Sequence, residues 1–206
     1  MPSKIITSVE PAATLTLDHV GVIIRSEENS RHVASNPSYC FVGMVLDKCH
    51  NYAREINGEY QAGEVTTGDI IITPPATWFY SQITGKLQCA CLWMTMDYIK
   101  SIAASIGMVG AQDILIKSAF KYRDSLLEAL FKAIISRISQ NDTASKTYVE
   151  SMARALCIHL LSTPLVEPIT ERSYRRTLTP QRIEMLRRYV MENIDQKIST
   201  PERAMQ

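Results

Sequence analysis

The sequence predicts an α+β fold in which a β-barrel precedes two or three amphipathic helices. Up to about Leu92, short apolar runs alternate with turn residues, which is typical of an all-β domain. After Met96, apolar residues recur every three or four positions, the period of one helix face. The chain has 206 residues, 46% of them apolar, which is enough for a sizeable core. We therefore expect a β domain over residues 1–96 and a helical region over 97–163.

Seven strands are expected in the β domain, each bounded by turn residues. Asn57-Gly58 predicts a tight hairpin between two of them, because both residues tolerate positive φ. Pro74-Pro75 ends another, since proline cannot donate to a strand ladder. Residues 1–14 are expected to be irregular. The predicted strands are His19–Ile24, Tyr39–Leu46, Tyr52–Ile56, Glu59–Val65, Asp69–Thr73, Trp78–Ile83 and Leu87–Thr95.

Three helices are expected after the β domain, at Asp97–Ile106, Lys121–Ser139 and Ser145–Ser162. The two longer ones carry apolar stripes, which can pack on the barrel, on each other or against a second subunit. We consider the stripe residues candidate contacts of a homodimer, with packing inside one subunit as the alternative. They are Leu127, Phe131, Ile134, Tyr148, Met152, Leu156 and Leu160.

A polar segment, residues 164–178, follows the helices and contains two prolines, so we expect an interdomain linker. The charge changes sign near this point. From Glu171 onward there are eight Lys and Arg against five Asp and Glu, net +3, whereas the preceding 170 residues carry net −2. A mildly basic end is compatible with nucleic-acid contact, and solvated helix faces are the alternative.

Several functional classes have no matching motif. The sequence begins without a basic-then-apolar signal, and no run of about 18 apolar residues is long enough to span a bilayer. Its five cysteines form no C-x-x-C pair, which predicts reduced thiols and a cytoplasmic location. Phosphate-binding glycine loops, G-x-S-x-G and H-E-x-x-H are absent, so we expect no catalytic residues and no membrane partner.

Cys89 and Cys91 lie two positions apart in an apolar run, which places both on one face of a strand. We interpret them as core residues, with metal ligands as the alternative. The four histidines have no ligand spacing.

The run from Gly68 to Ala76, GDIIITPPA, resembles the second motif of the cupins, G-x5-P-x-G, with alanine at the last position. The resemblance covers about residues 20–96 and implies a cupin-like β-barrel. Catalytic cupins bind a metal through two histidines and a glutamate of the first motif and a histidine after the second. Phe79 stands at the position of that last histidine, and the sequence has no H-x-H pair. We expect a barrel without metal or other cofactor, and such a barrel can still enclose a small ligand.

The C-terminal residues resemble the start of a DNA-binding module. Thr179-Pro180 predicts a helix start, and Ser199 with Glu202 predicts a second one about one turn before the sequence stops. Leu178-Thr179-Pro180, Tyr189-Val190, Asn193-Ile194 and Ile198-Ser199 resemble the opening of the C-terminal helix-turn-helix module of AraC/XylS-type bacterial transcription regulators. Residues Thr200 and Arg203 depart from that pattern, because the family usually has leucines there.

Together with the cupin-like region, this resemblance implies an effector-sensing and dimerisation part of such a regulator. It would carry only a truncated start of the DNA-binding domain, residues 179–206. The implied partners are a small-molecule effector, a second copy of the chain and, in an intact full-length form only, promoter DNA. Arg187 and Arg188 are candidate phosphate contacts, with a solvated helix face as the alternative.

The candidate effector contacts are flat aromatic side chains and one cation of the barrel. Trp78 and Tyr80 share one strand face, which points either into the barrel or toward the helices. Core packing is the alternative role for each aromatic residue. Two other functions remain open: a small cupin-type enzyme with an atypical site, and an interaction module that forms mixed dimers with full-length regulators. The candidate contacts are Tyr39, Arg54, Trp78, Tyr80 and Trp93.

Overall fold

The computed structural model describes residues 11–36, 38–138, 140 and 142–168. The described residues belong to one compact unit, so the predicted β domain and helical region are parts of the same folded body. Most of the predicted linker, the predicted DNA-binding start at 179–206, and with it Arg187 and Arg188, lie outside the described residues.

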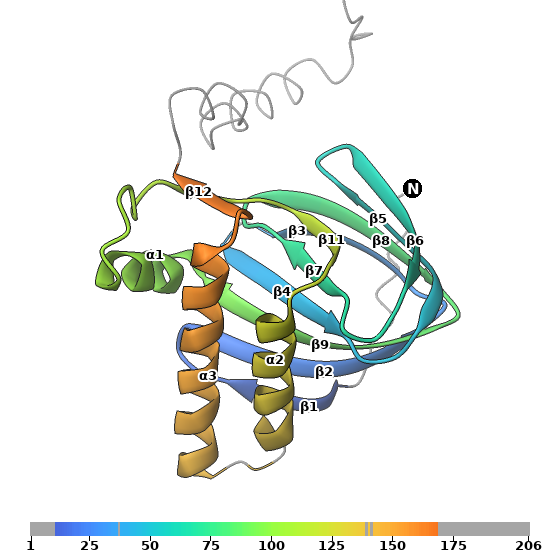
Figure 1. Cartoon of the computed structure of the whole chain (residues 1–206). Coiled ribbons are helices and arrows are strands. Elements are labelled where there is room, and N and C mark those ends of the chain that lie inside the picture. Colours follow the sequence, from blue (N-terminus) through green and yellow to red (C-terminus); the bar gives the residue numbers. More distant parts are fainter. Residues whose placement is uncertain (1–10, 37, 139, 141, 169–206) are drawn as a thin grey trace, which may run out of the picture. The chain divides into compact units, whose positions relative to one another are not determined.

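Two antiparallel sheets form the barrel (Figure 1). All seven predicted strands are present, and the order of barrel first and helices afterwards confirms the predicted α+β class. The larger sheet has the order β1 (Pro11–Thr16), β2 (Val20–Glu28), β9 (Lys86–Thr95), β4 (Tyr39–Val45), β7 (Ile70–Thr73) and β11 (Ala119–Tyr122). The smaller sheet has the order β3 (Arg31–Asn36), β8 (Thr77–Thr84), β5 (Cys49–Ile56) and β6 (Glu59–Val65).

The turns of the barrel follow the predicted turn chemistry. Asn57 and Gly58 have φ values of 51° and 86° and join β5 to β6. Strand β7 ends at Thr73, directly before the two prolines. Ala76 has a φ of 55°, in the left-handed region that favours glycine, which is the residue of the cupin motif at this position.

Three helices and a small two-stranded ribbon follow the barrel. The helices are α1 (Met96–Ser105), α2 (Ser125–Ile138) and α3 (Thr143–Ser162). The ribbon pairs β10 (Ile114–Ile116) with β12 (Val166–Pro168), so the first part of the predicted linker is a strand of the folded unit. Among the helices of the described residues, none is long and apolar enough to cross a membrane.

Helix α2 starts four residues later than the sequence pattern predicted. Residues Ala119–Tyr122 form β11, an edge strand paired with β7, and Lys121 within it has a φ of 58°. The carboxylate of Asp124 then accepts hydrogen bonds from the backbone N–H groups of Leu126 and Leu127, at 3.0 and 2.9 Å. These bonds satisfy amide donors that would otherwise lack partners in the first turn, so the helix begins at Ser125.

Helices α2 and α3 cover one face of the larger sheet and share a single core with it (Figure 1). This arrangement corrects the predicted dimer contacts. Five of the seven stripe residues are at most 1% exposed within one chain, so they are out of reach of a partner subunit. Tyr148 remains 38% exposed and Met152 is half-buried. The five residues in the core are Leu127, Phe131, Ile134, Leu156 and Leu160.

Candidate functional site

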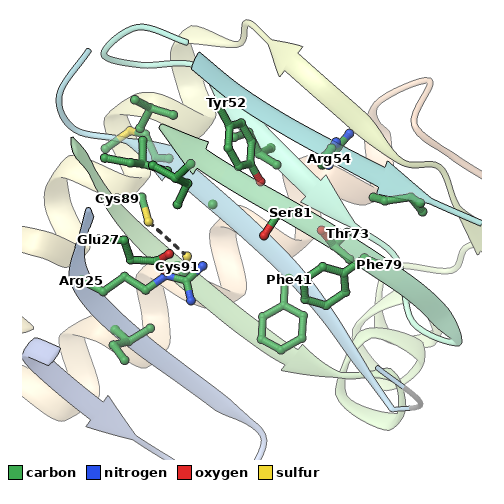
Figure 2. Close-up of a pocket in the computed structure, with 18 residues that line it drawn as sticks. Arg25, Glu27, Phe41, Tyr52, Arg54, Thr73, Phe79, Ser81, Cys89 and Cys91 are labelled. Carbon is green, nitrogen blue, oxygen red and sulfur yellow. Dashed lines mark hydrogen bonds and ion pairs between the residues drawn. The ribbon is translucent and has the colours of Figure 1, made fainter. Parts of the chain in front are cut away.

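A cavity of about 190 Å³ lies between the two sheets, on the side of the larger sheet opposite the helices (Figure 2). Because side chains alternate along a strand, one strand of the larger sheet can contribute residues both to the cavity and to the core under the helices. On β9, Ala90 and Leu92 are fully buried in the helix-side core, whereas Cys89 and Cys91 line the cavity. The polar lining consists of Arg25, Glu27, Tyr52, Arg54, Thr73, Ser81, Cys89 and Cys91.

An ion pair inside the barrel joins Arg25 and Glu27, both on β2, with Nε and Oε1 2.9 Å apart. The other oxygen of Glu27 accepts a hydrogen bond from the Ser30 hydroxyl at 2.9 Å and lies 2.5 Å from Nε2 of His32. Burial raises the pKa of Glu27, but the hydrogen bond from His32 and the charge of Arg25 outweigh burial and lower it. Glu27 is thus a buried carboxylate that remains ionised at neutral pH.

The ion pair leaves hydrogen-bonding capacity unused. Arg25 Nε and Glu27 Oε1 are both buried, and neither has a hydrogen-bond partner of good geometry. The two atoms attract each other electrostatically and have almost no accessible surface. Buried polar atoms in this condition are uncommon.

Two cysteines lie beside this ion pair. Arg25 is directly opposite Cys89 in the β2–β9 ladder, and the sulfur atoms of Cys89 and Cys91 are 3.8 Å apart (Figure 2). The hydrogen bond with Cys89 lowers the pKa of Cys91, and the charge of Arg25 lowers it further, against the opposing effect of burial. The same hydrogen bond and burial raise the pKa of Cys89. The pair shares one strand face, as predicted, but it faces the cavity.

Arg54 is the predicted contact residue that lines the cavity. It is 2% exposed, and its guanidinium group donates to Gln61 Oε1 at 2.9 Å, to the Ile72 carbonyl at 3.1 Å and to the Ser118 hydroxyl at 3.1 Å. It also lies 5.2 Å from the ring centre of Phe120. Burial lowers the pKa of Arg54. These contacts connect β5 to β6, β7 and the segment before β11, so Arg54 has a structural role at the edge of the cavity.

The other four predicted contacts are not among the residues that line the cavity. Trp78 and Tyr80 point to the outer face of the smaller sheet, because their neighbours Phe79 and Ser81 point inward. Trp78 is 46% exposed, so the two faces considered from the sequence, the barrel interior and the helix side, were both wrong for this pair. Ligand contact by these residues stays a prediction.

Tyr39 and Trp93 form an aromatic group beside the cavity. Their ring centres are 5.2 Å apart, and Tyr39 lies 6.3 Å from the ring of Phe41, which lines the cavity. Trp93 lies against Gly21, where a side chain would collide with the indole ring. Tyr39 therefore contacts both Trp93 and a ring that lines the cavity.

Phe79, at the position where catalytic cupins have a histidine, lines the cavity. Within the described part of the chain, no three His, Cys, Asp or Glu side chains are grouped so that they could bind a metal ion. Sequence reasoning missed the Arg25–Glu27 pair, although two charged residues two positions apart at the end of an apolar strand were a usable signal.

No protein-family model matches the sequence, and no curated protein matches it. Among solved structures, the AraC-like transcriptional activator CuxR is similar over 92% of this chain and 66% of its own, with 12% identity and a TM-score of 0.54. The cupin domain of Schizosaccharomyces pombe Cnp3 covers 47% of this chain and 69% of its own, with 10% identity and a TM-score of 0.36. The EutQ protein of Clostridium difficile covers 39% and 60%, with 12% identity and a TM-score of 0.32.

At these identities the likeness concerns the fold. The chain spans about two thirds of the length of CuxR and three fifths of that of the Clostridium difficile EutQ protein. Its barrel and helices have the architecture of a cupin-like domain followed by a helical layer, in agreement with the predicted fold class.

Proposed function

We propose that this chain is the effector-binding part of a transcription regulator of the AraC type. The observation that carries the proposal is the cavity between the sheets, which combines apolar walls with an ion pair and two thiols. Ligand sites have this character, with a few polar groups set in an apolar lining. The fold likeness to an AraC-like activator over 92% of the chain supports the regulatory context.

The size of the cavity limits the effector. An apolar cavity of about 150 Å³ accommodates benzene, which has six carbon atoms. A cavity of about 190 Å³ therefore fits a molecule of roughly six to ten non-hydrogen atoms. A nucleotide or a long acyl chain would exceed this volume.

The larger sheet can couple effector binding in the cavity to the position of the helices. Residues on one face of β9 line the cavity, and residues on its other face, such as Leu92, are packed in the core with α2 and α3. An effector that binds one arrangement of this sheet more tightly shifts the population toward that arrangement. In a regulator with complete reading domains, the shift would change how two subunits place those domains on paired DNA half-sites.

Filling the cavity provides the test. Gly43 lines it, and a side chain built there meets Cys91 Sγ at an ordinary contact distance of 3.6 Å. Wild-type protein and Gly43→Val are screened by thermal unfolding against compounds of up to roughly ten non-hydrogen atoms. A ligand at 100 times its Kd stabilises the wild type by about 2.7 kcal/mol, and we expect Gly43→Val to lose this stabilisation.

The matched control is Ala62→Val, which adds a comparable volume on the exposed β6 strand. It should keep the full ligand response. Equal stabilisation of wild type and Gly43→Val by every active compound would contradict binding in this cavity.

A further inference from the structure

The cavity holds a reactive arrangement of sulfur and charge that the proposed function does not use. The two thiols are 3.8 Å apart, with Arg25 opposite Cys89 in the ladder. The Nε atom of Arg25 is buried and lacks a well-oriented acceptor. Figure 2 shows the guanidinium group next to the Cys91 sulfur, both facing the cavity.

Cys91 differs from the other four cysteines. It is partly exposed, whereas the others are buried. Burial raises the pKa of Cys40 and of Cys157, the latter to about 12, and Cys49 contacts the carbonyl of Thr84 at 3.9 Å. Cysteines that react are those in electropositive, partly accessible surroundings, whereas buried structural cysteines are inert.

We propose that Cys91 is a nucleophile that captures a small α,β-unsaturated carbonyl compound in the cavity, with Cys89 as hydrogen-bond donor and Arg25 as anion-stabilising group. That the captured compound is the effector rests on the proposed function. The reactivity of Cys91 does not depend on that function.

The reaction balances without an oxidant or a leaving group. The Cys91 thiolate forms a carbon–sulfur bond to the β-carbon, and the π electrons of the C=C bond move to the carbonyl oxygen. The resulting enolate accepts a hydrogen bond from an Nη–H group of Arg25, whose side chain is 40% exposed and whose guanidinium group lies beside Cys91. The α-carbon then takes a proton from the Cys89 thiol or from water, and the Cys89 thiolate regains a proton from solvent.

The geometry favours this addition over oxidation to a disulfide. Cys89 and Cys91 are successive same-face residues of one extended strand, so their Cα atoms are about 6.6 Å apart. Their side chains point the same way, so their Cβ atoms are about as far apart, beyond the range of about 3.5–4.5 Å that a disulfide spans. Closing the bond would therefore require β9 to contract, although it is paired with β2 and β4 on both sides.

The experiment measures adduct formation by methyl vinyl ketone on the intact chain, by peptide mapping at pH values from 5 to 9. We expect Cys91 to react before the other cysteines. Its rate should rise with pH, and the midpoint of that rise should lie below the pKa of about 8.5 of an ordinary thiol. The groups that shift the pKa of Cys91 are Cys89 on the same strand and Arg25 and Glu27 from β2, and Tyr52 from β5 faces the same cavity. A bulky pyrene maleimide, too large for the cavity, should react at least about tenfold more slowly at Cys91 than at an exposed model thiol.

Substitutions of Arg25 and Cys89 test the assigned roles. Arg25→Gln should slow the reaction of Cys91 at pH 7 by about threefold or more, because loss of the positive charge raises the pKa of Cys91 while the hydrogen bond with Cys89 remains. Arg137→Gln removes an equal charge from the exposed face of α2 and should leave the rate unchanged. If Arg25→Gln fails to fold, Cys89→Ser serves instead: it retains a hydroxyl donor and should keep the rate within about threefold, whereas Cys89→Ala should lower it.

The proposal is overturned if Cys91 reacts no faster than Cys49, or if folded Arg25→Gln reacts like the wild type. Preferential conversion of Cys91 to a sulfenic acid by hydrogen peroxide, with no ketone adduct, would also overturn it. The two proposals can fail separately. If Cys91 is unreactive but Gly43→Val abolishes the ligand response, this inference is wrong and the proposed function is supported. If Cys91 is reactive but the protein binds no ligand reversibly, the inference is supported and the effector-sensing function is not.

Discussion

Ala76 shows that a turn can keep the backbone conformation of the cupin motif although alanine replaces the glycine of that motif. Ala76 adopts the left-handed conformation that the cupin motif gives to glycine. The turn is held by its neighbours: Pro74 and Pro75 restrict the chain before it, and the Thr77 hydroxyl donates to the Pro74 carbonyl at 2.7 Å. A non-glycine residue can persist in such a conformation when its surroundings determine it, at a cost of about 1–2 kcal/mol.

Ala76→Gly is therefore expected to stabilise the protein. Removing the Cβ relieves about 1–2 kcal/mol of backbone strain, and the more flexible unfolded chain offsets about half of this. The free energy of unfolding, measured with urea at pH 7, should rise by about 0.5–1 kcal/mol. As a control, Ala104→Gly in helix α1 should lower it by about 1 kcal/mol. A loss of stability in Ala76→Gly would contradict the strained turn.

At the scale of elements, the helix starts depend on carboxylates and hydroxyls that the sequence places before them. Asp124 caps α2 and also forms a hydrogen bond with His159 of α3, with Oδ2 and Nε2 2.9 Å apart. One side chain thus fixes the start of one helix and ties it to the next. Burial raises the pKa of Asp124, but hydrogen bonds from Leu127 N–H and His159 outweigh it, so the pKa is lowered.

The pH dependence of this cap follows from the lowered pKa. The ionised cap stabilises the folded state above the ordinary carboxyl value near 3.8, and the stabilisation is lost as pH falls through the lower folded-state pKa. Asp124→Ala should cost about 1–2 kcal/mol at pH 7 and progressively less below about pH 4. Urea unfolding from pH 7 to pH 3 measures the difference, and Asp113→Ala, in an exposed loop, should change stability by less than about 0.5 kcal/mol. A cost that stays constant down to pH 3 would exclude a charged cap.

At the scale of the whole described unit, the larger sheet separates two environments. Its helix side is an apolar core that includes Phe131 of α2, and its other side borders the cavity with the ion pair and the thiols. Five of the seven residues in the apolar stripes of the long helices lie in this core, so a partner subunit would have to contact other side chains.

Phe131→Ala tests that statement. Burial in the core of a single chain predicts a loss of about 3–5 kcal/mol. The loss should be the same at low and high protein concentration, because no association equilibrium is involved. Tyr148→Ala, at a position 38% exposed, should cost about 1 kcal/mol or less, mainly through the lost contact with Arg137. A loss for Phe131→Ala that changes with concentration would instead place this residue in a subunit interface.

The sequence by itself determined the features that depend on local chemistry. Asn57-Gly58, Pro74-Pro75 and the change from period two to period 3.6 near Met96 predicted the hairpin, the end of β7 and the order of barrel and helices. These signals are reliable because backbone conformation at glycine, asparagine and proline depends on the residue itself. Edge strands such as β1 and β11 carry weak patterns, and they form because a neighbouring strand offers hydrogen-bond partners.

The tertiary structure decided which strand faces line the cavity and which face the helices or the outside of the barrel. Alternation in the sequence places Trp78 and Tyr80 together and Cys89 and Cys91 together, but it does not specify which face of a strand is enclosed. That depends on the closure of two sheets and the position of the helices, which involve residues far apart in the sequence. The same closure brings Arg25 and Glu27 beside the two thiols, so the chemistry of the candidate site is a property of the fold.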